Sequence, residues 1–245
     1  MKVLPAIDLL DGRPVRLRQG DFEQVTRFDD DAVALARRFE AAGAEWLHVV
    51  DLDGARAGRW RNLEVIARLV AATSLPVQAG GGARETGDIE AALELGVERV
   101  VVGTAAVASP AAFERWAARY GDRIAVSLDV RGDRLAVRGW TAESADSLLT
   151  VASALEAAGA RRFIHTNVSR DGTLGGVDLA GLQQLLPLGL PVIVAGGIAG
   201  LDDVRALRDA GAEGAIIGRA LLDGSLDLVD VLRVAAGQPE GRPAV

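Results

Sequence analysis

Residues 76–82 read Pro-Val-Gln-Ala-Gly-Gly-Gly and residues 191–197 read Pro-Val-Ile-Val-Ala-Gly-Gly, so a short apolar run ending in glycines occurs twice, 115 residues apart. Gly-Gly pairs also recur by chance in a chain with 29 glycines, but several matches at nearly one spacing favour an internal repeat. The other matching pairs are residues 94–98 with 209–213, 102–103 with 217–218, 42–44 with 158–160, and 6–8 with 127–129. We therefore expect two similar halves, about residues 1–120 and 121–245.

Short β-branched runs alternate along the chain with longer Ala-, Leu-, Arg- and Glu-rich segments of helical period, as in repeated βα units. Helices are expected at about 32–42, 62–71 and 201–210, among others. The predicted strands are Val3–Ile7, Trp46–Val50, Val77–Ala79, Arg99–Val102, Ile124–Leu128, Arg162–Thr166, Val192–Val194 and Gly214–Ile217. Eight strands in 245 residues match one barrel, and duplicated four-strand halves close on each other more naturally than they form an open doubly wound sheet. The prediction is an α/β fold, a single (β/α)8 TIM barrel over residues 1–245 with an internal twofold repeat.

The charge balance argues against polyanionic partners. Formal net charge is −7 and the pI is about 5.0, without a run of five basic residues, so nucleic acid and an anionic membrane surface are disfavoured. No apolar stretch reaches the 18 residues of a membrane span, and Met1 runs directly into a predicted strand, which leaves no room for a signal peptide. We expect a cytoplasmic enzyme, a monomer, with a small-molecule substrate.

The residue inventory removes several reaction classes. With no cysteine there is no thiolate nucleophile, and the two histidines, His48 and His165, cannot form a three-histidine metal centre. The single lysine, Lys2, lies before the first strand and is badly placed for a Schiff base. We therefore expect no metal and no cofactor, and carboxylates are left to do the chemistry.

Asp8 and Asp129 end the first and fifth predicted strands and are partners in the repeat. The carboxyl ends of barrel strands build the active site, so these two side chains are expected on opposite sides of one cavity. Each aspartate alone could simply cap a loop. Their paired placement favours an acid–base pair.

The loop after the sixth strand carries further polar candidates. Thr166 ends that strand, and the loop reads Asp171-Gly172-Thr173-Leu174-Gly175-Gly176. Thr166 can hydrogen-bond a reacting oxygen, Asp171 can reach over the cavity, and Gly172, Thr173 and Gly175 can offer backbone amides. Asp-Gly-Thr is also simply a good turn sequence.

Two glycine-rich loop pairs resemble phosphate cradles. Glycine lets backbone amides approach a phosphate, and a following helix N-terminus adds favourable partial charge. Because the pairs are repeat partners, they imply a substrate with a phosphate at each end. The first pair has Gly81, Gly82 and Arg84 with Gly103 and Thr104, and the second has Gly196 and Gly197 with Gly218 and Arg219.

Four other side chains lie on the predicted strands or in the long loop: His48, His165, Arg138 and Trp140. Alternation along the sixth strand turns His165 toward the helix layer if Thr166 points inward, and we interpret both His165 and His48 as structural. Arg138 and Trp140, in the long loop after the fifth strand, could stack on a heterocycle and close over a ligand, or Trp140 could only anchor the loop.

Several ordered motifs together resemble the phosphoribosylformimino-aminoimidazole carboxamide ribotide isomerase family of histidine biosynthesis, over nearly the whole chain. They are Pro5-Ala6-Ile7-Asp8-Leu9, Gly12 with Arg16 and Gln19-Gly20, residues 48–53, Gly80-Gly81-Gly82, Ser127-Leu128-Asp129, Gly139-Trp140, Asp171-Gly172-Thr173 and Ala195-Gly196-Gly197.

The resemblance implies a cofactor-free Amadori rearrangement of an aminoaldose, carrying a phosphate on each arm, to the corresponding aminoketose. It places the general base on Asp8 and a second catalytic carboxylate on Asp129, with Thr166 and Asp171 also in the site. Arg16 and Gly20 fall on substrate-contacting positions. Whether Asp129 or Asp171 is the acid stays open.

Two positions depart from the family pattern. Ala83 replaces a branched residue, and Asn167 stands where an acidic residue is frequent, which could alter a loop contact.

Three alternative functions remain open. The cyclase of the same pathway has Cys-Leu-Asp where this chain has Ala6-Ile7-Asp8 and lacks the Gly-Trp loop. A bifunctional isomerase would also act on phosphoribosylanthranilate: residues 138–140 and 174–176 resemble that subgroup, whereas residues 80–82 resemble the histidine-only form. A non-catalytic phosphate binder would have no reason to keep the four polar residues at the strand ends.

Overall fold

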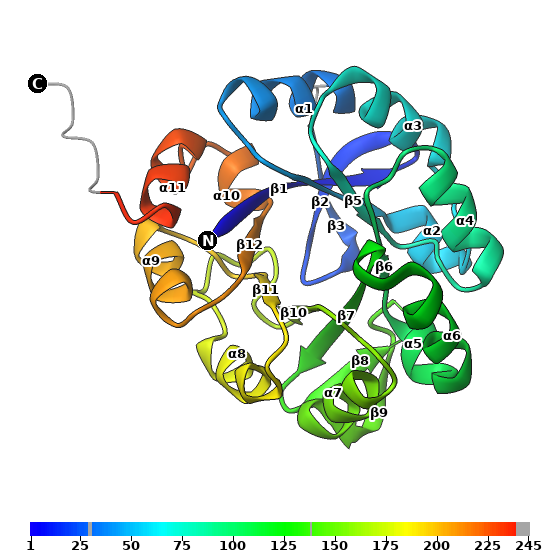
Figure 1. Ribbon diagram of the computed structural model, residues 1–245. Coiled ribbons are helices and arrows are strands. Elements are labelled where there is room, and N and C mark those ends of the chain that lie inside the picture. The colour runs from blue at the N-terminus through cyan, green and yellow to red at the C-terminus, as the bar shows by residue number, and fades with distance from the viewer. Residues whose placement is uncertain (29–30, 138, 239–245) are drawn as a thin grey trace, which may run out of the picture.

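The computed structural model describes residues 1–28, 31–137 and 139–238. In this part of the chain, eight parallel strands close into a barrel, with β10 paired to both β7 and β11, as the sequence predicted. Helices form a ring around these strands (Figure 1). The barrel strands are β1 (Lys2–Leu10), β4 (Leu47–Asp51), β5 (Val77–Gly80), β6 (Arg99–Val102), β7 (Ile124–Arg131), β10 (Phe163–Asn167), β11 (Val192–Ala195) and β12 (Gly214–Ile217).

The outer helices bury one apolar face each against the strands. In α3, Val65, Ile66 and Leu69 are buried, the spacing that places side chains on one side of a helix. Aspartate or serine side chains cap several helix starts, as Ser147 does for α7. The helices are α1 (Ala32–Ala41), α2 (Leu52–Ala57), α3 (Leu63–Ala72), α4 (Thr86–Glu94), α5 (Thr104–Ala108), α6 (Pro110–Tyr120), α7 (Leu148–Ala157), α8 (Leu179–Leu185), α9 (Leu201–Asp209), α10 (Arg219–Leu222) and α11 (Leu228–Ala235), with short 3-10 turns at Gly121–Arg123 and Leu186–Leu188.

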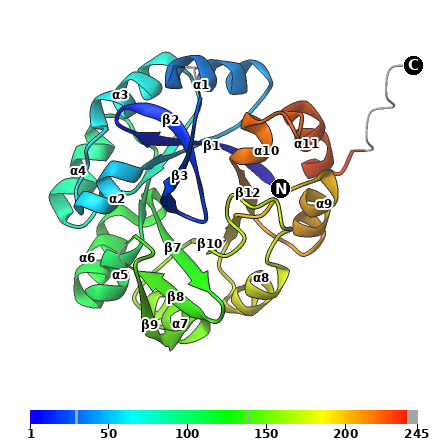
Figure 2. The same ribbon diagram turned by 180° about the vertical axis from the view of Figure 1, so that it is seen from behind.

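Two antiparallel hairpins extend the barrel where the sequence predicted only loops. β2 (Arg13–Arg18) and β3 (Asp21–Arg27) follow β1, and β8 (Arg134–Val137) and β9 (Ala142–Ser147) follow β7. Figure 2 shows both hairpins from behind. Because β2 pairs with β1 beyond Asp8, the first strand continues to Leu10. Both hairpins therefore stand at the carboxyl end of the barrel, beside the first and fifth strands.

Side-chain alternation separates the barrel interior from the layer under the helices. The interior cluster contains Leu4, Ala6, Val101, Ala125, Ile164, Ile193 and Ile216. Leu4, Ala6 and Asp8 share one face of β1, since successive strand residues point to opposite faces. Asp8 therefore points inward above the packed apolar interior of the barrel.

The two halves carry similar elements, although their duplication stays a prediction. Short helices α5 and α10 follow β6 and β12, and the residues before them, Gly103 and Gly218, have nearly equal φ, −115° and −106°. In the described residues, no helix is long and apolar enough to cross a membrane.

Candidate active site

A cavity opens at the carboxyl end of the barrel, and all four predicted catalytic side chains line it. Asp8 lies on β1, Asp129 on β7, Thr166 on β10, and Asp171 in the loop that follows β10. Thr166 is directly opposite Asp129 in the parallel register of β10 and β7.

Arg16, from β2, clamps two of the carboxylates. Its Nη1 donates to Asp8 Oδ2 at 2.8 Å, and its Nη2 donates to Asp171 Oδ1. Burial raises the pKa of Asp8, while Arg16 opposes the rise. Although burial disfavours its charge, Asp171 and Asp8 raise the pKa of Arg16 above its usual range. The clamp holds two acidic groups from distant parts of the chain in fixed orientations.

Asp129 is held by neutral donors. Ser127 Oγ donates to its Oδ1 at 2.6 Å, and the indole Nε1 of Trp140 donates to its Oδ2 at 2.8 Å. Burial raises the pKa of Asp129, and the bonds from Ser127 and Trp140 oppose the rise. Two carboxyl groups in one cavity thus have different environments, which is the usual arrangement for separate acid and base roles.

Trp140 is held down over the cavity in an uncommon backbone conformation. Its φ is +68°, in the left-handed region, and its ring lies against Gly20, where a Cβ would come within 2.3 Å of the indole. The other described non-glycine residues with positive φ, Asp11, Gln19 and Leu174, also lie in turns or loops outside the barrel strands. Backbone strain of this kind is typical of ligand-binding loops.

The glycine loops flank the cavity on both sides. Gly81, Arg84, Gly103 and Thr104 line it from β5 and β6, and Gly196 and Gly218 line it from β11 and β12. Arg16 and Gly20 complete the predicted contacts found in the lining.

Some of these glycines are required by close packing. At Gly81, φ is +110° and a Cβ would lie 2.2 Å from the Asp51 carbonyl oxygen. At Gly197, φ is +83° and a Cβ would lie 2.1 Å from the Gly176 carbonyl oxygen. A side chain at either position would displace backbone.

Matching aspartates hold the two loops in place. Asp88 Oδ2 accepts from the backbone amides of Arg84 and Glu85, both at 2.9 Å. Asp203 Oδ2 accepts from those of Ala199 and Gly200, at 2.8 and 3.2 Å. Each aspartate sits in the first turn of the following helix, so the loop is fixed to that helix.

Other predicted contacts lie outside the cavity lining. Gly82 packs on the Trp60 ring, and the Thr173 hydroxyl donates to the Arg170 carbonyl oxygen at 2.7 Å, closing a turn. Arg219 Nη1 donates to the Gly172 carbonyl oxygen at 2.5 Å and so ties α10 to this turn. The six in this group are Gly82, Gly172, Thr173, Gly175, Gly197 and Arg219. Arg138 lies outside the described residues.

Besides apolar side chains, the structure brings two polar side chains to the cavity that were not predicted there, Ser127 and His48. Ser127 is two residues before Asp129, so strand alternation alone could have placed both on one face. His48 was interpreted as structural, but it faces the barrel interior.

His165 points the other way, as alternation predicts, with Nε2 3.1 Å from Asp178 Oδ2 at the start of α8. Asn167 donates to the same oxygen at 2.9 Å. The departure at Asn167 thus forms a loop contact of its own. Among the described residues, no group of three or more His, Asp or Glu side chains is arranged to hold a metal ion.

Residues 2–227 match the family described as "Histidine biosynthesis protein". A relative from Chloroflexus aurantiacus is 48% identical over 236 residues, 96% of this chain and 98% of the relative. One from Roseiflexus castenholzii is 48% identical over 233 residues, 95% and 98% of the two chains. One from Rhodospirillum rubrum is 47% identical over 240 residues, 96% of this chain and all of the relative. Each is named 1-(5-phosphoribosyl)-5-((5-phosphoribosylamino)methylideneamino) imidazole-4-carboxamide isomerase. With its barrel and match over nearly its full length, the chain belongs to the histidine biosynthesis protein family.

Proposed function

We propose that this chain is an aldose–ketose isomerase that converts the phosphoribosylformimino aminoimidazole carboxamide ribotide aminoaldose into its phosphoribulosyl aminoketose in histidine biosynthesis. The observation that carries this proposal is the placement of Asp8 and Asp129 in one cavity between two glycine-loop pairs. The relatives compared above bear the name of this isomerase.

The reaction needs an acid that protonates the furanose oxygen as the ring opens and a base that removes the proton from sugar C2. We assign the base to Asp8. Its ion pair with Arg16 at 2.8 Å orients the carboxylate and leaves its other oxygen for the substrate. Each positioned proton transfer of this kind contributes about 10²–10⁴ in rate.

Asp129 and Asp171 are the two candidates for the acid. Burial raises the pKa of Asp129, which favours the protonated form that an acid requires. Asp171 instead accepts a hydrogen bond from the Arg16 guanidinium and must exchange that partner for the substrate before it can donate. Thr166, opposite Asp129, is placed to hydrogen-bond a reacting oxygen.

We propose that the two phosphates of the substrate bind at the two loop pairs, one beside Gly81 and Gly103 and the other beside Gly196 and Gly218. Arg84 and Arg16 line the same cavity and can balance the added negative charge. No cofactor takes part in this chemistry. We further propose that the protein works as a monomer in the cytoplasm. A second activity on phosphoribosylanthranilate and a non-catalytic binding role find no support in the names of the relatives.

The test is steady-state turnover of the formimino ribotide by the purified protein. We expect Asp8→Asn to lower kcat/KM by about 10²-fold or more. Asp129→Asn and Asp171→Asn are compared in parallel, and the acid is the one whose loss lowers kcat to a similar extent. Asp209→Asn, which changes an exposed carboxylate at the end of α9 outside the cavity lining, is the matched control. Turnover that survives Asp8→Asn unchanged would refute the assignment, and a parent protein without turnover would refute the proposed function.

A further inference from the structure

Three polar side chains form a chain of hydrogen bonds inside the barrel, between its lower end and the cavity. Arg99, Gln78 and His48 lie on the neighbouring strands β6, β5 and β4 and are paired in register. Arg99 Nη1 donates to Gln78 Oε1 at 2.9 Å, and Gln78 Nε2 lies 2.9 Å from His48 Nδ1. All three side chains are buried.

The direction of these bonds is fixed by the arginine. A guanidinium only donates, so the Gln78 oxygen must face Arg99, and the Gln78 amide nitrogen must face His48. The reversed amide would place two donors against each other. His48 Nδ1 is therefore an acceptor, and in the neutral ring the proton is carried by Nε2.

Arg99 is itself firmly held at the lower end of the barrel. Its guanidinium stacks on the Trp46 ring at 4.3 Å from the ring centre, and its Nε donates to the Asp122 carbonyl oxygen at 3.4 Å. Burial lowers the pKa of Arg99 to about 10, so it stays charged at neutral pH.

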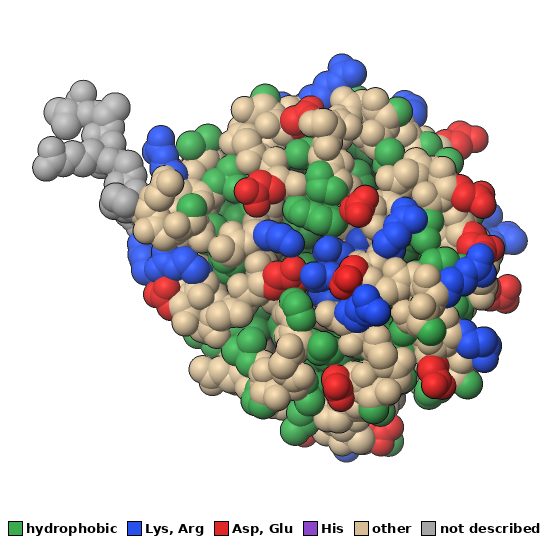
Figure 3. Space-filling model, viewed as in Figure 1, with side chains coloured by type: hydrophobic (Ala, Val, Ile, Leu, Met, Phe, Trp, Pro, Cys, Tyr) green, Lys and Arg blue, Asp and Glu red, His purple; other side chains and the backbone are tan. Residues whose placement is uncertain are grey.

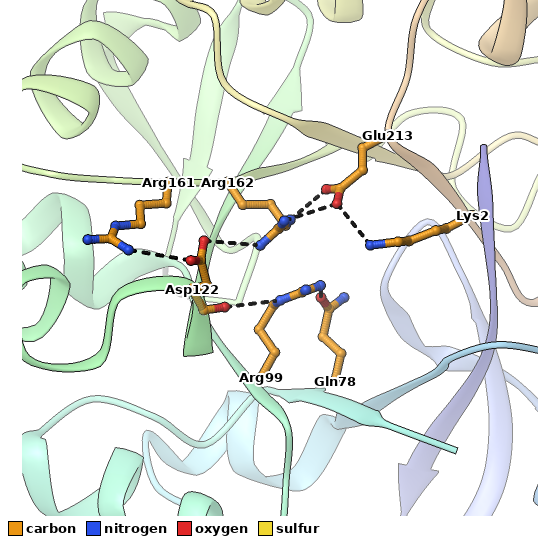
Figure 4. A network of polar contacts seen from close by, with 7 residues as sticks. All are labelled: Lys2, Gln78, Arg99, Asp122, Arg161, Arg162 and Glu213. Carbon is orange, nitrogen blue, oxygen red and sulfur yellow. Dashed lines mark hydrogen bonds and ion pairs between the residues drawn. The ribbon is translucent and has the colours of Figure 1, made fainter. Parts of the chain in front are cut away.

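Figure 4 shows Arg99 and Gln78 within a larger network. Arg162 donates from Nε to Glu213 at 2.5 Å, and Lys2 lies 3.3 Å from the same carboxylate. Basic and acidic side chains gather near the middle of the corresponding face (Figure 3). Arg99, the first residue of the hydrogen-bond chain, is thus held within a network of polar contacts at this end of the barrel.

The other end of the chain reaches the cavity. His48 lines it, on the strand next to Asp8, and is paired with Ala6. Burial and the nearby Arg16 lower the pKa of His48 to about 4, so the ring is neutral at physiological pH. Among the described residues, its Nε2 has no hydrogen-bond partner.

We propose that Arg99 and Gln78 position His48 as the Nε2–H tautomer, and that His48 donates this hydrogen bond to a sugar oxygen of the substrate. The role of His48 rests on the isomerase function proposed above. After ring opening, C1 is bound to nitrogen as a protonated imine, so removal of the C2 proton by Asp8 forms the C1–C2 double bond and neutralises that nitrogen. Negative charge develops on the C2 oxygen in the following step, as the enolamine hydroxyl gives up its proton to become the ketone carbonyl and C1 takes up a proton. A neutral imidazole can stabilise that charge by donating a hydrogen bond. Because the neutral ring is not held in an ion pair, it does not have to give up a charged partner first. Gln78 and Arg99 act only through His48 and are positioning residues.

The tautomer can be read directly by nitrogen NMR of the whole protein labelled at histidine, because the chain has two histidines. The signals are assigned with His48→Gln, which removes one set. We expect protonated Nε2 and unprotonated Nδ1 for His48 at neutral pH. In Gln78→Glu, the carboxylate can only accept from the ring, so Nδ1 should become protonated. His165, bound to Asp178 on the outer side of the barrel, is the internal control and should not change.

Turnover then tests the contact with substrate. Gln78→Glu should lower kcat/KM by about 10²-fold, mainly through kcat. His48→Gln, which keeps an N–H near the position of Nε2, should retain more activity than His48→Asn, whose shorter amide reaches only the position of Nδ1. If Gln78→Glu does not fold, the comparison of His48→Gln with His48→Asn still tests the contact between His48 and the substrate.

Two results would overturn the proposal: an Nδ1–H tautomer in the parent protein, or a changed tautomer in Gln78→Glu with kcat/KM within about threefold of the parent. Equal activity of His48→Gln and His48→Asn would also contradict the proposal, because it would show that a donor at the position of Nε2 does not contribute to turnover. A parent protein without turnover would instead refute the isomerase function, while the NMR spectrum would still report the hydrogen-bond chain separately.

Discussion

Replacing Ser127 by alanine should raise the pKa of Asp129 without disturbing the rest of the site. The hydroxyl donates to Asp129 Oδ1 at 2.6 Å, and this bond stabilises the ionised carboxylate. The change removes one oxygen from a residue on a barrel strand. The bond from Trp140 to the other carboxylate oxygen remains.

The magnitude follows from the type of bond. A hydrogen bond to a charged group contributes about 1.5–3 kcal/mol, and about 1.4 kcal/mol corresponds to one pKa unit. Water in the cavity can replace part of the lost donor, because Asp129 lines an open cavity. We therefore expect an upward shift of about one unit.

The shift also has a consequence for stability. Burial already raises the native pKa of Asp129 above its unfolded value, so the native protein binds this proton more tightly. The unfolding free energy attributable to this group therefore falls as pH rises from the unfolded to the native pKa. Ser127→Ala raises the native pKa and so extends this pH range upward. The variant should therefore continue to lose stability at pH values where the parent no longer does.

Carbon NMR of labelled aspartate carboxyl groups measures the pKa, with Asp129→Asn to assign the signal. Ser74→Ala is the matched control, since Ser74 Oγ donates to Glu40 at the same distance, 2.6 Å, on the protein surface. The control should leave Asp129 unchanged. An Asp129 pKa that does not rise in Ser127→Ala would refute the view that this bond holds the carboxylate.

Gly197→Ala should lower the midpoint of thermal unfolding, because its Cβ would lie 2.1 Å from the Gly176 carbonyl oxygen at positive φ, a strain of order 1–3 kcal/mol. Gly87→Ala, in a helix with no atom within 4 Å of the new Cβ, should be neutral or slightly stabilising, and equal effects of the two changes would contradict the packing argument. Asp178 has a pKa well below its usual value, chiefly through the hydrogen bond with His165. The stabilisation of the folded protein by this carboxylate should be complete above the pKa of an unfolded aspartate and should be lost as pH falls through the native pKa of Asp178. Asp178→Asn should therefore make the free energy of unfolding, measured with denaturant, depend less on pH in the acid range.

The parts of the fold that the sequence predicted are those set by local periodicity. All eight barrel strands lie within a few residues of their predicted positions, because short apolar runs are readable along the chain and glycines mark the ends of β5, β6, β11 and β12. Asp8, Asp129 and Thr166 were placed correctly at the cavity by one rule, that barrel strands present their carboxyl ends to the site.

The hairpins β2–β3 and β8–β9 could not be predicted in the same way. Most side chains of β3 and β9 are exposed or half-buried, so their sequences lack a strong apolar pattern. Their pairing depends on the upper ends of β1 and β7, which only the assembled barrel supplies.

The sequence by itself determined the barrel, the paired aspartates and the glycine loops, since each follows from spacing along the chain. Tertiary structure alone decided how these groups are held. Arg16 reaches Asp171 across 155 residues, and His48 lines the cavity only because β4 lies between β1 and β5 in register. Hydrogen-bond direction and burial depend on neighbours across strands, and a linear pattern does not specify those neighbours.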